Sequence, residues 1–155
     1  MRLELIHPMV VHFPIVLGLG LFAVDGIAAL RKWPLSGRGA VANTSAIVAV
    51  AAGIFAVIAF VFGDQAYDIA LAAANAPKDA LEIHQEIGSI TAFALAGWAA
   101  ARAFLWWRNV KLGAAAGYGI AGIEALLVAA VLVAAWYGGE LVYHYGVAVE
   151  KLANG

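Results

Sequence analysis

The stretch HPMVVHFPIVLGLGLFAVDGIAAL, residues 7–30, decides the fold of this chain. It is almost entirely apolar, and it exceeds the roughly 20 residues that an α-helix needs to cross a bilayer. Its apolar run is too long for a cleavable signal peptide. It also lacks the alternation of polar and apolar residues that marks a transmembrane β-strand. The stretch therefore predicts a membrane-spanning helix.

Three more apolar stretches follow along the chain. The sequence predicts transmembrane helices over about 8–30, 44–63, 82–107 and 113–145, with a short surface helix over about 65–76. Of the 155 residues, 65% are hydrophobic and 12% are charged, whereas soluble domains are about 25% charged. We therefore expect an all-α protein, an integral membrane four-helix bundle in which residues 1–155 form a single transmembrane domain.

The charged residues predict the orientation of the bundle. The two loops at 31–43 and 108–112 contain only basic charges, namely Arg31, Lys32, Arg38, Arg108 and Lys111. Such loops face the cytoplasm under the positive-inside rule. Both termini are then extracytoplasmic, and we expect a multi-pass protein of the bacterial inner membrane. The net charge of −1 gives no support for a nucleic-acid partner.

The chain has no cysteine and four histidines, so imidazole is the chief metal ligand available. The predicted topology places all four at the extracytoplasmic end of the bundle: His7, His12, His84 and His144. We expect them to ligate a b-type haem, with His12 and His84 as the first axial pair. His7 and His144 would form a second pair for a second haem, or contact the propionates. The small residues Gly18 and Gly88 would give the macrocycle access between helices.

Two other interpretations of the histidines remain open. Carboxylates lie near them at Glu82, Glu86 and Glu140, and three imidazoles with a carboxylate would suit a zinc, copper or non-haem iron ion. The protein would then bind or transport a divalent metal. Alternatively, the histidines are only polar residues at the level of the lipid headgroups. In that case the protein is a non-catalytic structural or anchor subunit of a membrane complex.

Three further charges lie within the predicted spans: Asp25, Arg102 and Glu124. Asp25 and Arg102 are at matching heights near the cytoplasmic ends of their helices, and Glu124 is somewhat deeper. Because an unpaired charge in hydrocarbon is costly, we expect an ion pair between Asp25 and Arg102, with Glu124 close by. A proton-handling or quinone site in this half of the bundle is the functional alternative.

Three motifs carry a resemblance to a family of small, uncharacterised bacterial membrane proteins with four helices. They are HPMVVHFPIVLGLGLFAVD at 7–25, HxxxG at 84–88 and GGELVYHYGVAV at 138–149. The residues that match are His7, Pro8, His12, Pro14, Asp25, His84, Gly138, Gly139, His144 and Gly146. The resemblance implies association with, or fusion to, redox modules such as c-type cytochrome or Rieske domains, and hence electron transfer.

Together these observations predict a cytochrome b-like electron-transfer subunit rather than a stand-alone enzyme. It would pass electrons between an extracytoplasmic redox protein, such as a c-type cytochrome or a Rieske-like domain, and an acceptor in the membrane. That acceptor would be the quinone pool or other subunits of a larger complex. No set of nucleophile and base typical of a hydrolase is visible in the sequence.

Overall fold

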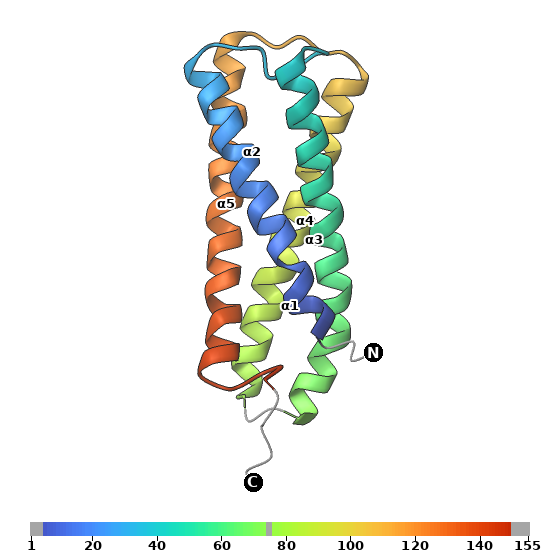
Figure 1. The fold of residues 1–155 in the computed structure, drawn as a ribbon, viewed down its shortest axis with the longest axis vertical. Coiled ribbons are helices and arrows are strands. Elements are labelled where there is room, and N and C mark those ends of the chain that lie inside the picture. The colour runs from blue at the N-terminus through green and yellow to red at the C-terminus, as the bar shows by residue number, and fades with distance from the viewer. Residues whose placement is uncertain (1–4, 74–75, 150–155) are drawn as a thin grey trace.

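A computed structural model describes residues 5–73 and 76–149 of the chain. Its helices are α1 (Ile6–Val10), α2 (His12–Leu30), α3 (Ala40–Ala73), α4 (Lys78–Trp107) and α5 (Ala114–Tyr143) (Figure 1). Helices α1 and α2 follow one another in a single span, and all four spans are long and apolar enough to cross a membrane. The predicted all-α, four-helix membrane fold is confirmed.

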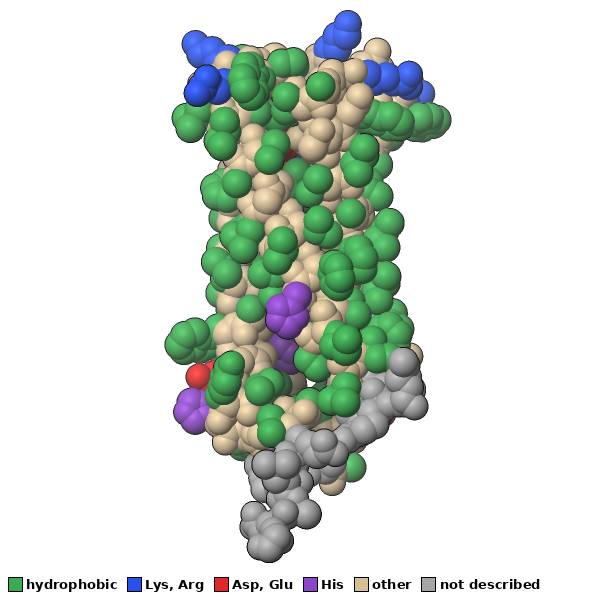
Figure 2. All heavy atoms as spheres, in the orientation of Figure 1, with side chains coloured by type: hydrophobic (Ala, Val, Ile, Leu, Met, Phe, Trp, Pro, Cys, Tyr) green, Lys and Arg blue, Asp and Glu red, His purple; other side chains and the backbone are tan. Residues whose placement is uncertain are grey.

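The four spans form an antiparallel ring. Helix α2 packs against α3 and α5, and α4 packs against the same two neighbours. The α2–α3 and α4–α5 loops lie together at one end, which we call the basic end because it carries Arg31, Lys32, Arg38, Arg108 and Lys111 (Figures 1 and 2). The opposite end holds the start of α1 and the end of α5, and we call it the histidine end. Polar residues of different kinds are therefore separated along the bundle axis.

Small residues let the helices approach closely. Helix α3 buries a series of alanines, including Ala49, Ala52 and Ala56, and Ala56 packs against Ala92 and Leu95 of α4. At Gly53 the approach is closest, because a Cβ added there would lie 2.5 Å from the Cβ of Ala99 on α4. Large apolar side chains instead cover the outside of the bundle (Figure 2). This division is typical of membrane helices, which associate through small residues rather than by burying large apolar ones.

The main differences from the predicted helix bounds are in α3 and in the first span. Helix α3 runs on to Ala73, so no separate surface helix begins at 65. One glycine at 63 costs a helix only about 1 kcal/mol, and no proline intervenes before Pro77. Helix α5 continues through Gly138 and Gly139 to Tyr143. The first span is interrupted at Val11, because Pro14 lacks the N–H that would bond to the carbonyl of Val10.

Candidate functional site

His7 lies inside the histidine end on α1. Its Nδ1 is 2.8 Å from the carbonyl oxygen of Ala59 on α3, and the side chain is half-buried. Because a carbonyl oxygen can only accept a hydrogen bond, Nδ1 carries the hydrogen and donates it. The other ring nitrogen, Nε2, then keeps its lone pair. The contact with α3 thus fixes both the tautomer and the position of this imidazole.

His84 on α4 faces His7. The two ring centroids are 6.1 Å apart, and the ring planes meet at 74°. The His84 Nδ1 is buried and makes no hydrogen bond of ordinary geometry with the residues that the structure describes, although the Ala134 carbonyl on α5 lies beside the ring. Buried polar atoms without a partner are rare and ask for an explanation. The pair therefore contains a buried ring nitrogen whose hydrogen bonding is incomplete.

Two glycines cradle the imidazole pair. A Cβ added at Gly63 on α3 would lie 2.9 Å from the Nδ1 and Cε1 atoms of His7. A Cβ at Gly138 on α5 would lie 3.0 Å from the Cε1 atom of His84. Both distances are shorter than ordinary van der Waals contact. The imidazoles thus occupy spaces that exist because these two positions have no side chain, and each of the four spans contributes one residue.

The other two histidines lie on the surface. His12 is exposed on α2, and His144 is exposed just after α5, where its Nδ1 is 2.8 Å from a carboxylate oxygen of Glu140. The histidine side chains visible in Figure 2 lie in the half of the bundle opposite the basic end. The structure thus brings His7 and His84 together and leaves His12 and His144 outside. Over residues 5–73 and 76–149, no three His, Asp or Glu side chains meet closely enough to hold a metal ion.

The two glycines expected to make room for a cofactor have open space beside them. Gly18 is buried in α2 and Gly88 is half-buried in α4, one turn after His84. A Cβ added at either position would have no atom of another element within 4 Å. A side chain at either position would therefore not touch a neighbouring helix, as is also true of Gly20 and Gly97.

A second polar site lies toward the basic end, where Asp25, Arg102 and Glu124 are all buried. Arg102 Nη1 donates to Oδ2 of Asp25 at 2.6 Å and to Oε1 of Glu124 at 2.8 Å. Arg102 Nη2 donates to the carbonyl oxygen of Leu35 at 3.3 Å. One guanidinium thus joins two acids from different helices, as pairing of buried charges requires.

Two neutral side chains, Ser45 and Trp98, complete this cluster, and neither was predicted from the sequence. The hydroxyl of Ser45 on α3 donates to Oδ1 of Asp25, and the indole Nε1 of Trp98 donates to Oε1 of Glu124 at 3.1 Å. Ser45 was detectable in principle. Asp25 and Ser45 are the same number of residues away from Leu35 in the α2–α3 loop, one before it and one after it. In an antiparallel pair of helices, two positions at equal distance from the connecting loop lie side by side.

A family model described as Predicted membrane protein (DUF2231) matches residues 4–151. The chain belongs to this family. No curated protein and no solved structure matches it. Membership of this family agrees with the four membrane spans. The description of the family names no reaction or ligand.

The two sites offer different chemistry. In the cluster of Asp25, Arg102 and Glu124, almost every polar atom has a partner, so its immediate effect is to hold four helices together. The imidazoles of His7 and His84 lie edge to face, with their centroids 6.1 Å apart. Imidazole nitrogens with free lone pairs are ligands for haem iron, zinc and copper. The imidazole pair is therefore the stronger candidate for a cofactor site.

Proposed function

We propose that this chain is a membrane electron-transfer protein that binds a b-type haem between His7 and His84. The spacing of the two rings carries this proposal. A bond between a metal and an imidazole nitrogen is about 2 Å long, and the nitrogen is about 1 Å from the ring centre. Two imidazoles on opposite sides of one iron ion therefore have centroids about 6 Å apart. The observed separation is 6.1 Å.

The hydrogen bonding of His7 supports the same assignment. A histidine that ligates a metal almost always donates its other ring N–H to a carbonyl or carboxylate oxygen, which fixes its tautomer and orientation. His7 has this arrangement with Ala59. The unpartnered nitrogen of His84 is the atom of the pair that most requires a further contact. The donor set thus fits an axial ligand pair.

The number of ligands favours haem over a bare metal ion. A structural zinc ion takes four protein ligands and a catalytic one takes three, whereas haem iron needs only one or two axial ligands from the protein. Among the described residues, two imidazoles meet and a third ligand does not join them.

Bound haem would supply one-electron oxidation and reduction, and the protein would supply its position in the membrane. The site is near one end of the bundle, close to water, where an electron can pass to or from a soluble domain. Exposed acids at that end include Asp64, Asp68, Asp79, Glu82 and Glu86, and they favour a partner with a basic surface. We infer a c-type cytochrome or Rieske-like partner outside the bacterial inner membrane, with quinone or another subunit as the second partner.

Visible absorption spectra test this proposal directly. The protein would be expressed with ample haem precursor, purified in detergent and measured oxidised and after reduction with dithionite. We expect a Soret band, a sharp α-band on reduction and extractable haem b. Preparations that bind zinc, copper or iron without porphyrin would overturn the proposal in favour of a metal-binding protein. Preparations without either group would overturn it in favour of a structural subunit.

A further inference from the structure

We propose that Glu124 is a proton-binding site that exchanges its proton with water at the basic end of the bundle. The site is separate from the imidazole pair. Arg102 and His84 are 18 positions apart on α4, or about 27 Å at 1.5 Å per residue, so the proposal stands whether or not haem is bound. It rests on three features of the structure: the hydrogen bonds of the two acids, the charge count of the cluster and a cavity beside it.

The hydrogen bonds distinguish the two acids. Both oxygens of Asp25 accept hydrogen bonds, Oδ1 from Ser45 and Oδ2 from Arg102. Glu124 accepts two hydrogen bonds on Oε1, but its buried Oε2 has no partner within the described part of the chain. A carboxylate that receives donors on both oxygens is stabilised in its charged form. Oε2 of Glu124 is therefore the atom of this cluster with a lone pair free for a proton.

The charge count gives the reason for a proton. Asp25 on α2 and Arg102 on α4 are the charged groups that contact Glu124 or its partners, and α3 contributes the neutral Ser45. Two carboxyl groups share one guanidinium, so the cluster carries one acid more than its cation can neutralise. An unpaired charge surrounded by apolar helices is costly. A proton on Oε2 would remove the excess charge without moving any helix.

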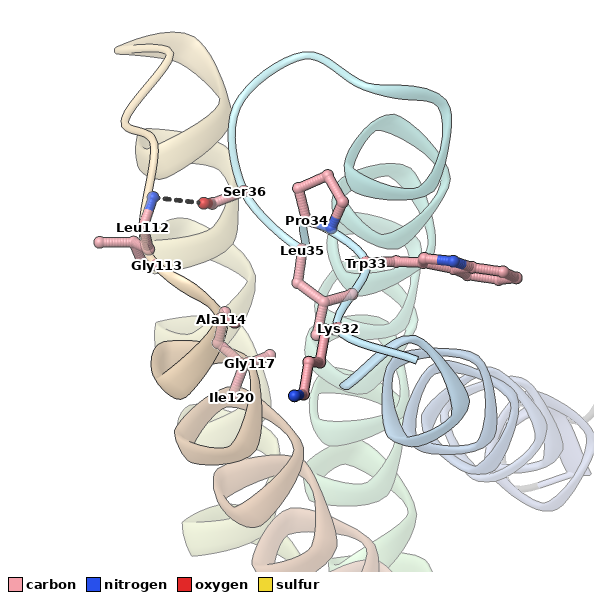
Figure 3. Close-up of a pocket in the computed structure, with 10 residues that line it drawn as sticks. All are labelled: Lys32, Trp33, Pro34, Leu35, Ser36, Leu112, Gly113, Ala114, Gly117 and Ile120. Atoms are coloured by element: carbon pink, nitrogen blue, oxygen red, sulfur yellow. Dashed lines mark hydrogen bonds between the residues drawn. The ribbon is translucent and has the colours of Figure 1, made fainter. Parts of the chain in front are cut away.

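A cavity leads toward this cluster from the basic end. It has a volume of about 80 Å³ and lies between the α2–α3 loop and the first turns of α5, with Lys32, Ser36, Gly117 and Ile120 among its lining residues (Figure 3). This volume holds a few water molecules. Ile120 is one helical turn before Glu124 on α5. The cavity thus brings water to within about one turn of the acid.

A thin apolar layer separates the cavity from the cluster. Leu35 and Ile120 both line the cavity and pack in one buried group with Ala28 and Ala29. The carbonyl oxygen of Leu35 also accepts the hydrogen bond from Arg102, so the loop that forms the cavity is tied to the cluster. Rotation of the Ile120 side chain would connect the water with Glu124. The proton would move from a hydronium ion at the basic end through the cavity water to Oε2, leaving water behind, and would return by the same route.

Infrared spectroscopy of the haem-free protein tests this inference. We expect a carboxylic acid C=O band that shifts when glutamate carboxyl groups carry ¹³C and when water is replaced by D₂O. Labelling of aspartate should leave the band unchanged, and Glu124→Gln should remove it. The isotope shift is measured on the wild-type protein, so this part of the test does not require Glu124→Gln to fold. Absence of a glutamate band at every pH at which the protein stays folded would overturn the inference.

The proton path is tested by the rate at which this band shifts in D₂O. Ile120→Ala opens the apolar layer and should speed the exchange several-fold. Ile123→Ala removes the same atoms from an exposed position on α5 and should leave the rate unchanged. Equal rates in the two variants would overturn the proposed path, since the proton would then reach Glu124 by another route. A failure of the haem proposal would change neither measurement, because both use haem-free protein.

Discussion

The bundle contains two groups of buried or half-buried polar residues, and they differ in how far the protein satisfies them. Around Asp25 and Arg102, charges and hydroxyl or indole donors from four elements bind one another, and a single carboxylate oxygen is left over. At the other end, His7 has one hydrogen bond and the buried Nδ1 of His84 has none with the described residues. The comparison suggests that the first group stabilises the bundle, whereas the second is arranged for a bound group.

Removing the cation of the cluster should have the largest effect on stability. Arg102→Met would leave Asp25 and Glu124 buried without their shared partner, and breaking a buried ion pair in this way costs about 3–5 kcal/mol. We expect a large loss of free energy of unfolding in detergent, or no folded protein. Arg108→Met changes an exposed arginine and should have little effect. Equal stability of the two variants would contradict the structural role of the cluster.

A smaller loss of stability is expected when the hydroxyl group of Ser45 on α3 is removed. Ser45→Ala removes the hydroxyl that donates a hydrogen bond to Oδ1 of Asp25. Leaving a buried acceptor without its donor lowers the free energy of unfolding by about 1–3 kcal/mol. Thr44→Ala changes the neighbouring, exposed residue and serves as the control. Thermal denaturation in the same detergent measures both variants. If Ser45→Ala were no less stable than the control, the contact with Asp25 would not contribute to folding.

The smallest change in stability is expected at Gly63, the glycine beside His7. An alanine in place of a helical glycine gains up to about 1 kcal/mol from helix propensity, and we expect Gly97→Ala, which faces open space on α4, to show this gain. In Gly63→Ala the new methyl group would press on His7, and such overpacking costs about 1–3 kcal/mol. The gain should be lost there, and the α-band of the reduced protein should shift. Identical behaviour of the two variants would mean that the cradle does not position the imidazole.

The sequence predicted the four spans because continuous apolar runs have few alternatives in a membrane protein. It could not predict which histidines face each other. Membrane helices are apolar on every side, so the first span, formed by α1 and α2, has no polar face that would reveal that His12 on α2 is exposed and His7 on α1 is half-buried. The close packing at Gly63 and Gly138 was equally hidden, since it depends on the angles between helices.

The inner cluster shows the same limit. Asp25, Arg102 and Glu124 stood out because charges are rare within apolar stretches, whereas Ser45 and Trp98 are ordinary residues there. The continuous α3 was missed for another reason. A change from apolar to polar composition near Asp64 marks where the chain leaves the membrane, but a helix ends only where its backbone hydrogen bonds are interrupted, and no residue there interrupts them.

The most direct test of the haem assignment compares the four histidines in one experiment. Each would be replaced by alanine, and the purified proteins would be examined by visible spectroscopy in the reduced state, with bound haem b quantified. We predict that His7→Ala and His84→Ala lose the spectrum of bis-imidazole haem, and that His12→Ala and His144→Ala retain it. Loss of haem in His12→Ala together with its retention in His7→Ala would contradict the account.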